Sequence, residues 1–244
     1  MANDTEQPET TEKGGMSFLG HIEELRRCLL KSIVAVVVMS GVAFYFSDEL
    51  IKFIQIPLDG TPLHNMQVTG TFYAYLKVSL IAGVIAALPI MFYQMWAFLS
   101  PGLLRSEKRM VIPLILVSTV LFLTGAAFCF YISLPISLKF LIGFSDGLIV
   151  NYITVGSYIS FAGLLILAFG FGFQLPIVCF VLGRMGIISS RFLSRGRRYA
   201  FVLILVAGAI ITPPDVFTQV LLAVPIYLLY EISILVVRLT GKGE

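Results

Sequence analysis

Long apolar segments recur along this chain and constrain its fold more than any other feature. The 244-residue sequence is 58% hydrophobic. Its apolar segments run approximately over residues 31–47, 72–98, 110–132, 156–183, 199–212 and 217–237. A bilayer core about 30 Å thick needs about 20 apolar residues of helix to span it, and no ten-residue alternation of a membrane β-barrel is visible. The sequence therefore predicts an all-α integral membrane protein with six transmembrane helices.

Basic residues predict the orientation of these helices, because Lys and Arg concentrate in cytoplasmic loops. An even number of spans puts both termini on one side of the membrane. The basic residues of the tails, the second loop and the fourth loop would lie on that side: Lys13, Arg26, Arg27, Lys31, Arg105, Lys108, Arg109, Arg184, Arg191, Arg195, Arg197, Arg198, Arg238 and Lys242. We predict two cytoplasmic termini, with a disordered tail over 1–20, a single membrane domain over 21–238 and a short tail over 239–244.

The fifth apolar segment is too short to cross an ordinary bilayer. Arg197 and Arg198 precede it, and Pro213 and Pro214 follow it. Proline lacks a backbone N–H and pushes the preceding residue out of the α region, so the helix has to end there. About 14 residues remain, or roughly 21 Å of helix. Such a helix must thin the membrane or open a wet depression, which favours a protein that disturbs the bilayer.

The two outer loops, about 48–71 and 133–155, carry prolines, glycines and apolar residues. We predict that they form short interfacial helices capping the outer side of the bundle. The fragment 134–144 is too short and too interrupted to span, and is predicted to lie along the interface. The three cysteines, Cys28, Cys129 and Cys179, have no paired spacing and are predicted to be small buried apolar residues.

Little in this sequence supports catalysis. Both histidines, His21 and His64, lie in flanking or loop segments, and there is no Gly-rich phosphate loop, CxxC or HExxH. We therefore expect no enzyme activity, metal, cofactor or nucleic-acid partner. The polar exceptions within the predicted spans are Lys77, which can snorkel outward, Gln174 and Glu231. Glu231 is interpreted as a carboxylate snorkelling or paired near the interface, with a proton or substrate relay as the alternative.

Acidic residues stand out on the basic cytoplasmic face. Glu23 and Glu24 open the first helix, and Glu107 opens the third. An acid in the first helical turn interacts favourably with the helix dipole, so a structural role is open for each. The alternative is a pair of carboxylates that binds a cationic peptide. Arginine is the natural ligand, because its guanidinium binds a carboxylate through two hydrogen bonds.

An aromatic segment, residues 93–102, ends the second span just before Glu107. Its aromatic side chains are predicted to form an interfacial belt. Beside the carboxylates, the same apolar edge could receive a peptide in which hydrophobic residues follow the arginines.

From about His21 to Arg238 the chain resembles TatC, the polytopic core subunit of the twin-arginine protein translocase. The resemblance rests on six motifs in order: His21-Ile22-Glu23-Glu24-Leu25-Arg26, Pro57-Leu58, Pro89-Ile90 through Gln94-Met95-Trp96-Ala97-Phe98, Glu107-Lys108-Arg109 with Pro113, Ala168-Phe169-Gly170 to Pro176, and Thr212-Pro213-Pro214-Asp215. It implies a cup-shaped bundle with short fifth and sixth helices in a bacterial inner membrane. It also implies a multimeric complex with TatA-like and TatB-like single-span subunits, which moves folded proteins with the proton-motive force.

The resemblance also assigns roles to residues. Glu24 and Glu107 match the acids that recognise the twin-arginine signal peptide, and Arg26 and Phe98 match neighbouring positions of that site. Pro57 matches a position in the outer cap. Asp215 and Gln219 match positions at the start of the last helix.

One position departs from the family pattern. The fourth segment commonly carries a membrane-embedded glutamate, where this chain has Gln174. An amide can hydrogen-bond to a partner segment but cannot shuttle protons, so we expect a polar docking point there. Two rival functions stay open. A small-molecule permease would need a sealed polar pocket at mid-depth, and a scaffold would have no ligand of its own.

Overall fold

The computed structural model describes residues 18–99, 111–143, 152–212 and 215–240. Within these ranges the chain is helical almost throughout, which confirms the all-α prediction. The helices are α1 (Phe18–Tyr45), α2 (Ser47–Ile54), the 3₁₀ turn η1 (Ile56–Leu58), α3 (Gly70–Leu99), α4 (Val111–Phe128), the π-helical turn η4 (Cys129–Ser133), α5 (Leu134–Gly143), α6 (Val155–Gly172), α7 (Leu175–Arg184), α8 (Ser190–Ile211) and α9 (Val216–Thr240).

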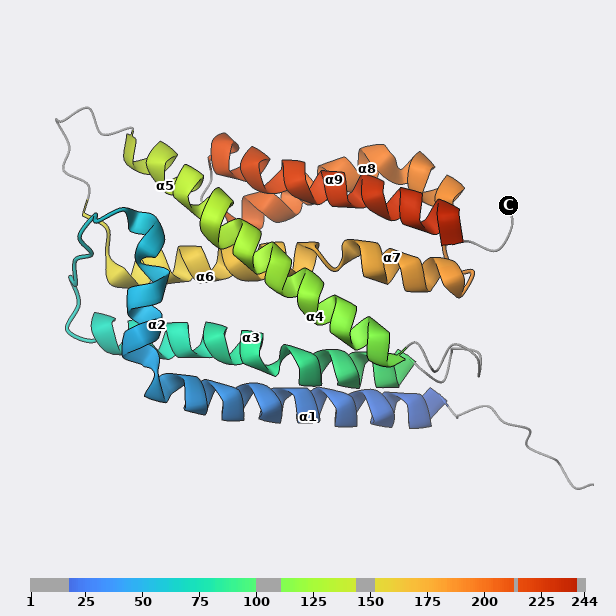
Figure 1. The fold of residues 1–244 in the computed structure, drawn as a ribbon, viewed down its shortest axis with the longest axis horizontal. Coiled ribbons are helices and arrows are strands. Elements are labelled where there is room, and N and C mark those ends of the chain that lie inside the picture. Colours follow the sequence, from blue (N-terminus) through green and yellow to red (C-terminus); the bar gives the residue numbers. More distant parts are fainter. Residues whose placement is uncertain (1–17, 100–110, 144–151, 213–214, 241–244) are drawn as a thin grey trace, which may run out of the picture.

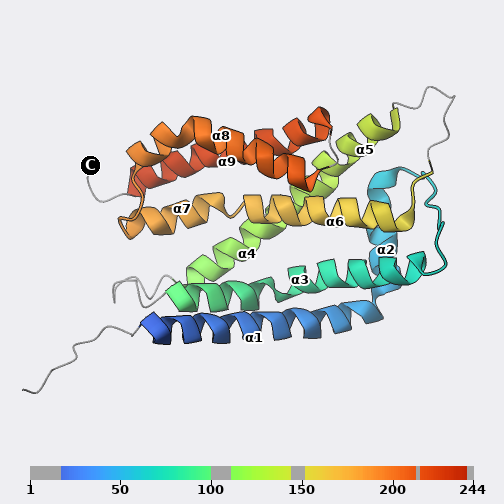
Figure 2. The ribbon, with the colours of Figure 1, turned by 180° about the vertical axis from the view of Figure 1, so that it is seen from behind.

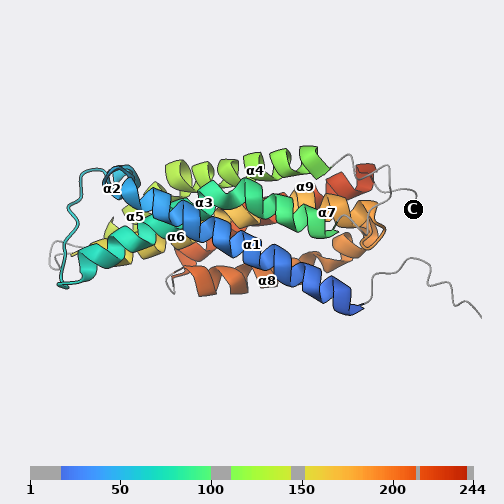
Figure 3. The same ribbon diagram turned by 90° about the horizontal axis from the view of Figure 1, so that it is seen from below.

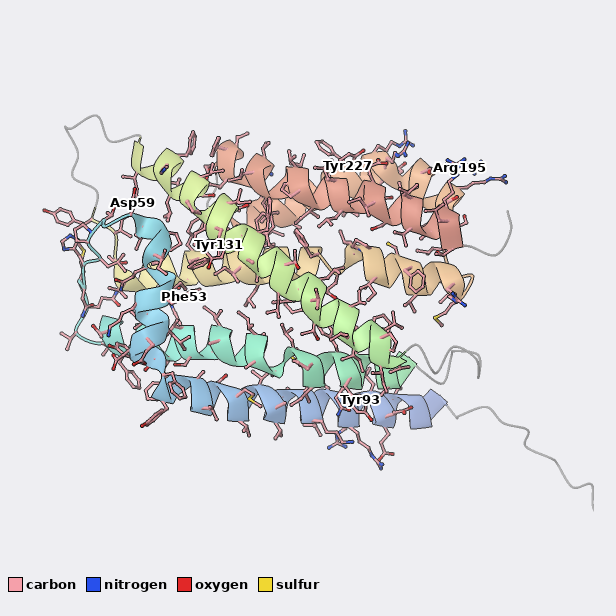
Figure 4. All side chains as sticks on the ribbon, viewed as in Figure 1. Phe53, Asp59, Tyr93, Tyr131, Arg195 and Tyr227 are labelled. Atoms are coloured by element: carbon pink, nitrogen blue, oxygen red, sulfur yellow. The ribbon has the colours of Figure 1, made fainter. Side chains whose placement is uncertain are left out.

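The long helices run back and forth along the long axis of the molecule (Figures 1 and 2). α1 starts and α9 ends at the same end of the bundle (Figure 1). α4 lies on one face and α8 on the opposite face (Figure 3). Figure 4 places Arg195 of α8 at one end and Asp59, which follows η1, at the other. We call the end that holds α2 and η1 the cap end, and the other the arginine end.

Five helical stretches in the described ranges are long and apolar enough to cross a membrane: Ile22–Tyr45, Gly70–Phe98, Val111–Gly143, Val155–Arg184 and Val216–Thr240. Five of the six predicted spans are therefore confirmed. The remaining one, the fifth segment, lies in α8, which at 22 residues is longer than the predicted helix of about 14 residues because it begins at Ser190. It is not among the five, because its first half carries Arg191, Arg195, Arg197 and Arg198 and its apolar part begins at Tyr199. The orientation in the membrane stays a prediction.

The fragment 134–144 is not the separate, interrupted segment that was predicted. Its helical part, α5, continues α4 through the π turn η4 (Figure 1), and the candidate span Val111–Gly143 includes it. Its position relative to the membrane interface stays a prediction. A π turn has wider hydrogen-bonded rings than an α-helix. Here it ends two residues before Pro135, which cannot donate a backbone hydrogen bond. Leu134 and Leu138 hold α5 against the core, where both are buried.

Prolines mark two further helix boundaries. α6 ends at Gly172 and α7 begins at Leu175, with Pro176 in its first turn. α8 ends before Thr212, whose extended backbone (φ −90°, ψ 159°) is what a following proline favours. The predicted break after the fifth segment is thus confirmed. The sixth helix, however, is not short: α9 has 25 residues.

Short helices cap one end of the bundle, as predicted. Pro57 lies in the first turn of η1, and Leu58 beside it is buried. The two outer loops also pair through their backbones, which the sequence did not indicate. The N–H of His64 donates to the Ile153 carbonyl (2.9 Å), and the N–H of Val155 donates to the His64 carbonyl (3.1 Å).

α6 is the most buried of the long helices and packs against α3 and α4. Ile159, Ala162 and Phe169 on α6 are fully buried in the largest apolar cluster. Glycines permit the close approach to neighbouring helices. A Cβ on Gly170 would lie 2.4 Å from the ring of Phe122 on α4. Cys129 and Cys179 are buried and free, as predicted, and Cys28 is free and half-buried.

Candidate functional site

Two adjacent acids at the start of α1, Glu23 and Glu24, differ in exposure because they lie on different faces of the helix. Glu23 is exposed and pairs with Arg27 one turn later on the same helix (2.8 Å). Glu24 is half-buried. It lies in a stripe of half-buried α1 residues that continues through Cys28, Ser32 and Ser40 at helical spacing. A Cβ on Gly83 of α3 would lie 2.1 Å from the Ser40 hydroxyl, so this stripe is the face that α1 packs against α3.

Glu24 therefore faces α3 at the arginine end of the bundle. α1 and α3 run antiparallel, so the start of α1 lies at the same end as the last residues of α3 (Figures 1 and 2). Those last residues include Phe98, which is half-buried. Arg26, two positions after Glu24, is exposed. Glu107 lies outside the described residues.

The aromatic segment at the end of α3 does not form a simple interfacial belt. Tyr93 is exposed, and Figure 4 shows it on α3 near the arginine end. Trp96 is 1% exposed, in a cluster with Leu88 and Phe122. Its indole N–H donates to the Ser118 hydroxyl of α4 (3.2 Å). The prediction of an interfacial anchor was wrong for Trp96, because its ring packs among buried apolar residues and its N–H has a hydrogen-bond acceptor on α4.

Gln174 lies inside the bundle at the break between α6 and α7, and it is 7% exposed. Its amide nitrogen donates to the Ser118 carbonyl (3.1 Å) and to the Gly170 carbonyl (3.5 Å). Its Oε1 is buried and has no hydrogen-bond partner among the described residues. Trp96, Ser118 and Gln174 thus form one polar contact chain across α3, α4 and the α6–α7 break.

The start of α9 is held by the two residues predicted there. The Asp215 carboxylate accepts hydrogen bonds from the backbone N–H (2.7 Å) and the hydroxyl of Thr218. Asp215 thereby caps the start of α9. Gln219 donates to the Leu205 carbonyl of α8 (2.9 Å). Both side chains therefore stabilise the turn between α8 and α9.

Glu231 pairs with Arg197 across α8 and α9 (2.9 Å). This supports the interpretation of a carboxylate paired near the interface. In the described ranges, no group of three or more His, Cys, Asp or Glu residues gathers to hold a metal ion.

The family model of TatC, described as Sec-independent protein translocase protein, matches residues 20–225. The chain belongs to the TatC family. TatC from Desulforapulum autotrophicum is 41% identical over 232 residues, which cover 93% of this chain and 86% of that protein. TatC from Aquifex aeolicus is 43% identical over 235 residues and covers 94% of this chain and 98% of that protein.

A solved structure supports the same assignment. The crystal structure of a twin-arginine translocase receptor, TatC, is 44% identical and superposes with a TM-score of 0.83. The superposition covers 90% of this chain and 99% of the chain in the crystal structure. The described helices therefore have the TatC fold of a multi-pass membrane protein in a Sec-independent protein translocase.

The structure brings together only part of the predicted TatC site. Glu24 and Phe98 lie at the same end of the bundle, whereas Pro57 lies at the cap end and Asp215 and Gln219 lie at the α8–α9 turn. Ser118 is the polar residue that the sequence reasoning missed. It is one of several hydroxyl residues in the apolar α4, next to Thr119, and its position opposite Trp96 and Gln174 appears only when α3, α4 and α6 pack together.

Proposed function

We propose that this TatC-family chain is the receptor for twin-arginine signal peptides. In this proposal it is the core of a translocase that moves folded proteins across the bacterial inner membrane with the proton-motive force. The observation that carries the proposal is the position of Glu24, half-buried on the α3-facing stripe of α1 at the end where α3 reaches Phe98. Glu24 and Glu107 bind the two signal arginines. Arg26 is exposed on another face of α1, so it acts on the segment that carries Glu24 and not on the Glu24 carboxylate itself. Phe98 contacts the apolar residues that follow.

The carboxylates suit arginine for physical reasons. Each carboxylate accepts two parallel hydrogen bonds from a guanidinium, which lysine cannot supply. A hydrogen bond to a charged group contributes about 1.5–3 kcal/mol. Two such sites give useful affinity that can still be released.

The test is binding of a fluorescent twin-arginine peptide to the purified protein in nanodiscs, with a lysine-pair peptide alongside at the same salt. Glu24→Gln and Glu107→Gln are each expected to weaken binding by about tenfold or more, or about 1.4 kcal/mol. Glu23→Gln is the matched control, because Glu23 is exposed and already paired with Arg27. Equal binding by all variants would support a scaffold without a ligand of its own and overturn the receptor proposal.

The same proposal places TatA-like and TatB-like single-span helices against α8 and α9. Val202, Val206 and Ile210 form an exposed apolar stripe on α8 at a spacing of four residues. A photo-crosslinking residue at Val206 should capture a single-span partner in membranes. The same residue at Leu116, exposed on α4 at the opposite face (Figure 3), should not. Equal capture at both positions would contradict this docking surface.

A further inference from the structure

A polar pocket of about 530 Å³ lies at the cap end between the starts of α3 and α6. Its walls come from the loop before α3, the first turns of α3, and the start of α6 with the residue before it. The lining residues are Asn65, Met66, Gln67, Gly70, Tyr73, Lys77, Thr154, Gly156, Ser157 and Ser160. None of the described residues that line it is acidic. The described wall of the pocket therefore combines a cation with hydroxyl groups and contributes no carboxylate to balance that cation.

Lys77 is the cation of this pocket, and its depth in the membrane is unusual. The span Gly70–Phe98 begins seven residues before it, which places its Cα roughly 10 Å below the start of the helix. Its ammonium donates to the Ser160 hydroxyl on α6 (2.7 Å). That hydroxyl in turn donates to the Gly156 carbonyl (2.8 Å). No ion pair to Lys77 occurs among the described residues.

A charged side chain within a span is costly unless a partner compensates it. An ammonium has three N–H donors, and Ser160 uses one of them. Ser160 holds the ammonium at the pocket wall, so the remaining donors are available to an anion in the pocket.

The start of α6 adds to the positive potential. α6 is an 18-residue helix, and its first N–H groups have no acceptor within the helix. The Val155 N–H donates to His64 and the Ser157 N–H donates to the Thr154 side chain. Gly156, between them, lines the pocket, and a Cβ built there would meet no atom within 4 Å. Helix starts favour phosphate for this reason.

We propose that this pocket binds the phosphate group of an anionic phospholipid from the leaflet at the cap end. Tyr73 and Leu80 lie one turn before and after Lys77 on the same face of α3, and both are exposed and apolar in character. Leu80, one turn deeper in the span than Lys77, offers a surface for an acyl chain, and Tyr73, one turn nearer the cap end, lines the pocket beside the headgroup. Because none of the described lining residues offers a carboxylate to a choline cation, we expect the pocket to select phosphatidylglycerol over phosphatidylcholine.

Native mass spectrometry of the delipidated protein in detergent tests this directly. Dioleoyl phosphatidylglycerol is titrated against the wild type and against Lys77→Gln, Lys77→Arg and Lys52→Gln. Lys52 is the matched control, since it is an exposed lysine on α2 at the same end. The expected result is about tenfold weaker lipid binding for Lys77→Gln, or about 1.4 kcal/mol. Lys77→Arg should retain binding, and Lys52→Gln should match the wild type.

Two further probes separate the sources of phosphate. Dioleoyl phosphatidylcholine should bind about tenfold more weakly than phosphatidylglycerol to the wild type. Millimolar inorganic phosphate should not displace the lipid, because it lacks the acyl chains. Displacement by phosphate would overturn the lipid as ligand, and so would equal binding of both lipids. Unchanged phosphatidylglycerol binding in a monomeric, helical Lys77→Gln protein would show that Lys77 only extends toward the membrane surface.

Discussion

At the residue scale, Gln174 has an unusual position for a polar side chain in a membrane protein. Its amide nitrogen bonds to two carbonyl groups, while its buried Oε1 has no partner among the described residues. Interhelical hydrogen bonds in membranes contribute on average about 0.6 kcal/mol. Removing the amide is therefore expected to cost little stability, so a large loss of transport in such a variant would point to a role of Gln174 beyond the stability of the bundle.

We predict that Gln174→Leu weakens partner docking or transport, while its midpoint of thermal unfolding in detergent stays close to that of the wild type. Gln174→Glu should be tolerated, because a protonated carboxyl can still donate to the Ser118 carbonyl. Transport assays in inverted membrane vesicles, with partner crosslinking in parallel, measure both effects. Equal transport by the wild type and the Leu variant would contradict a docking role for this residue.

At the element scale, helix contacts depend on residues that lack side chains. A Cβ on Gly170 would meet three ring atoms of Phe122, the nearest at 2.4 Å, and Phe122 is fully buried. Neither helix has room to yield, because the ring is enclosed in the core.

We therefore predict that Gly170→Ala destabilises the bundle by about 1–3 kcal/mol, the usual cost of overpacking. Gly41→Ala in α1 is the control, since its Cβ would meet no atom within 4 Å. That substitution should be neutral or stabilising by up to about 1 kcal/mol, because alanine favours helix. Unfolding followed by circular dichroism in detergent gives both values. Equal stability of the two variants would mean that α4 and α6 are not close-packed at Gly170.

The apolar part of α8 is also a property of the element. It begins at Tyr199 and ends at Ile211, so it spans only about 20 Å of helix. We predict that the wild type is most active in thin bilayers. Replacing Arg195 and Arg198 together by Leu leaves Arg197, which is paired with Glu231, as the one charged residue of α8 after Arg191, and should shift the optimum to thicker bilayers.

Reconstitution into phosphatidylcholines of increasing chain length measures this optimum. Arg197 is left unchanged in the double variant, because it pairs with Glu231. The same optimum for both proteins would show that α8 does not determine the preferred bilayer thickness.

At the scale of the whole molecule, the two ends of the bundle differ in character. The arginine end holds Arg195, and the cap end holds α2, η1 and the paired outer loops (Figure 4). The first described helix, α1, starts at the arginine end, and the last, α9, ends there (Figure 1). Because Lys and Arg favour the cytoplasmic side, we predict that this end is cytoplasmic.

Reporter fusions test this orientation. Green fluorescent protein fused after Glu244 should fluoresce, and alkaline phosphatase fused there should be inactive. Alkaline phosphatase inserted after Gly60, in the outer cap, should be active. The reverse pattern would contradict the predicted orientation of the whole bundle.

The sequence by itself determined which segments are apolar helices and where prolines end them, because hydropathy and proline chemistry act over a few neighbouring residues. Hence the end of α8 at Ile211 lies where the local rule places it. The α6–α7 break before Pro176 obeys the same rule but was not predicted, because the fourth segment was expected to run unbroken over 156–183. Glu24 and Phe98 could also be named from the sequence, through the family resemblance.

Only the tertiary structure decided which face of each helix is buried. Lipid-facing and core-facing side chains are equally apolar in a membrane protein, so hydropathy does not distinguish them. For this reason the sequence could not show that Trp96 enters the core, that α5 continues α4, or that Glu24 rather than Glu23 faces α3. The backbone pairing of His64 with the loop before α6 joins residues far apart in the chain, and long-range packing alone brings them together.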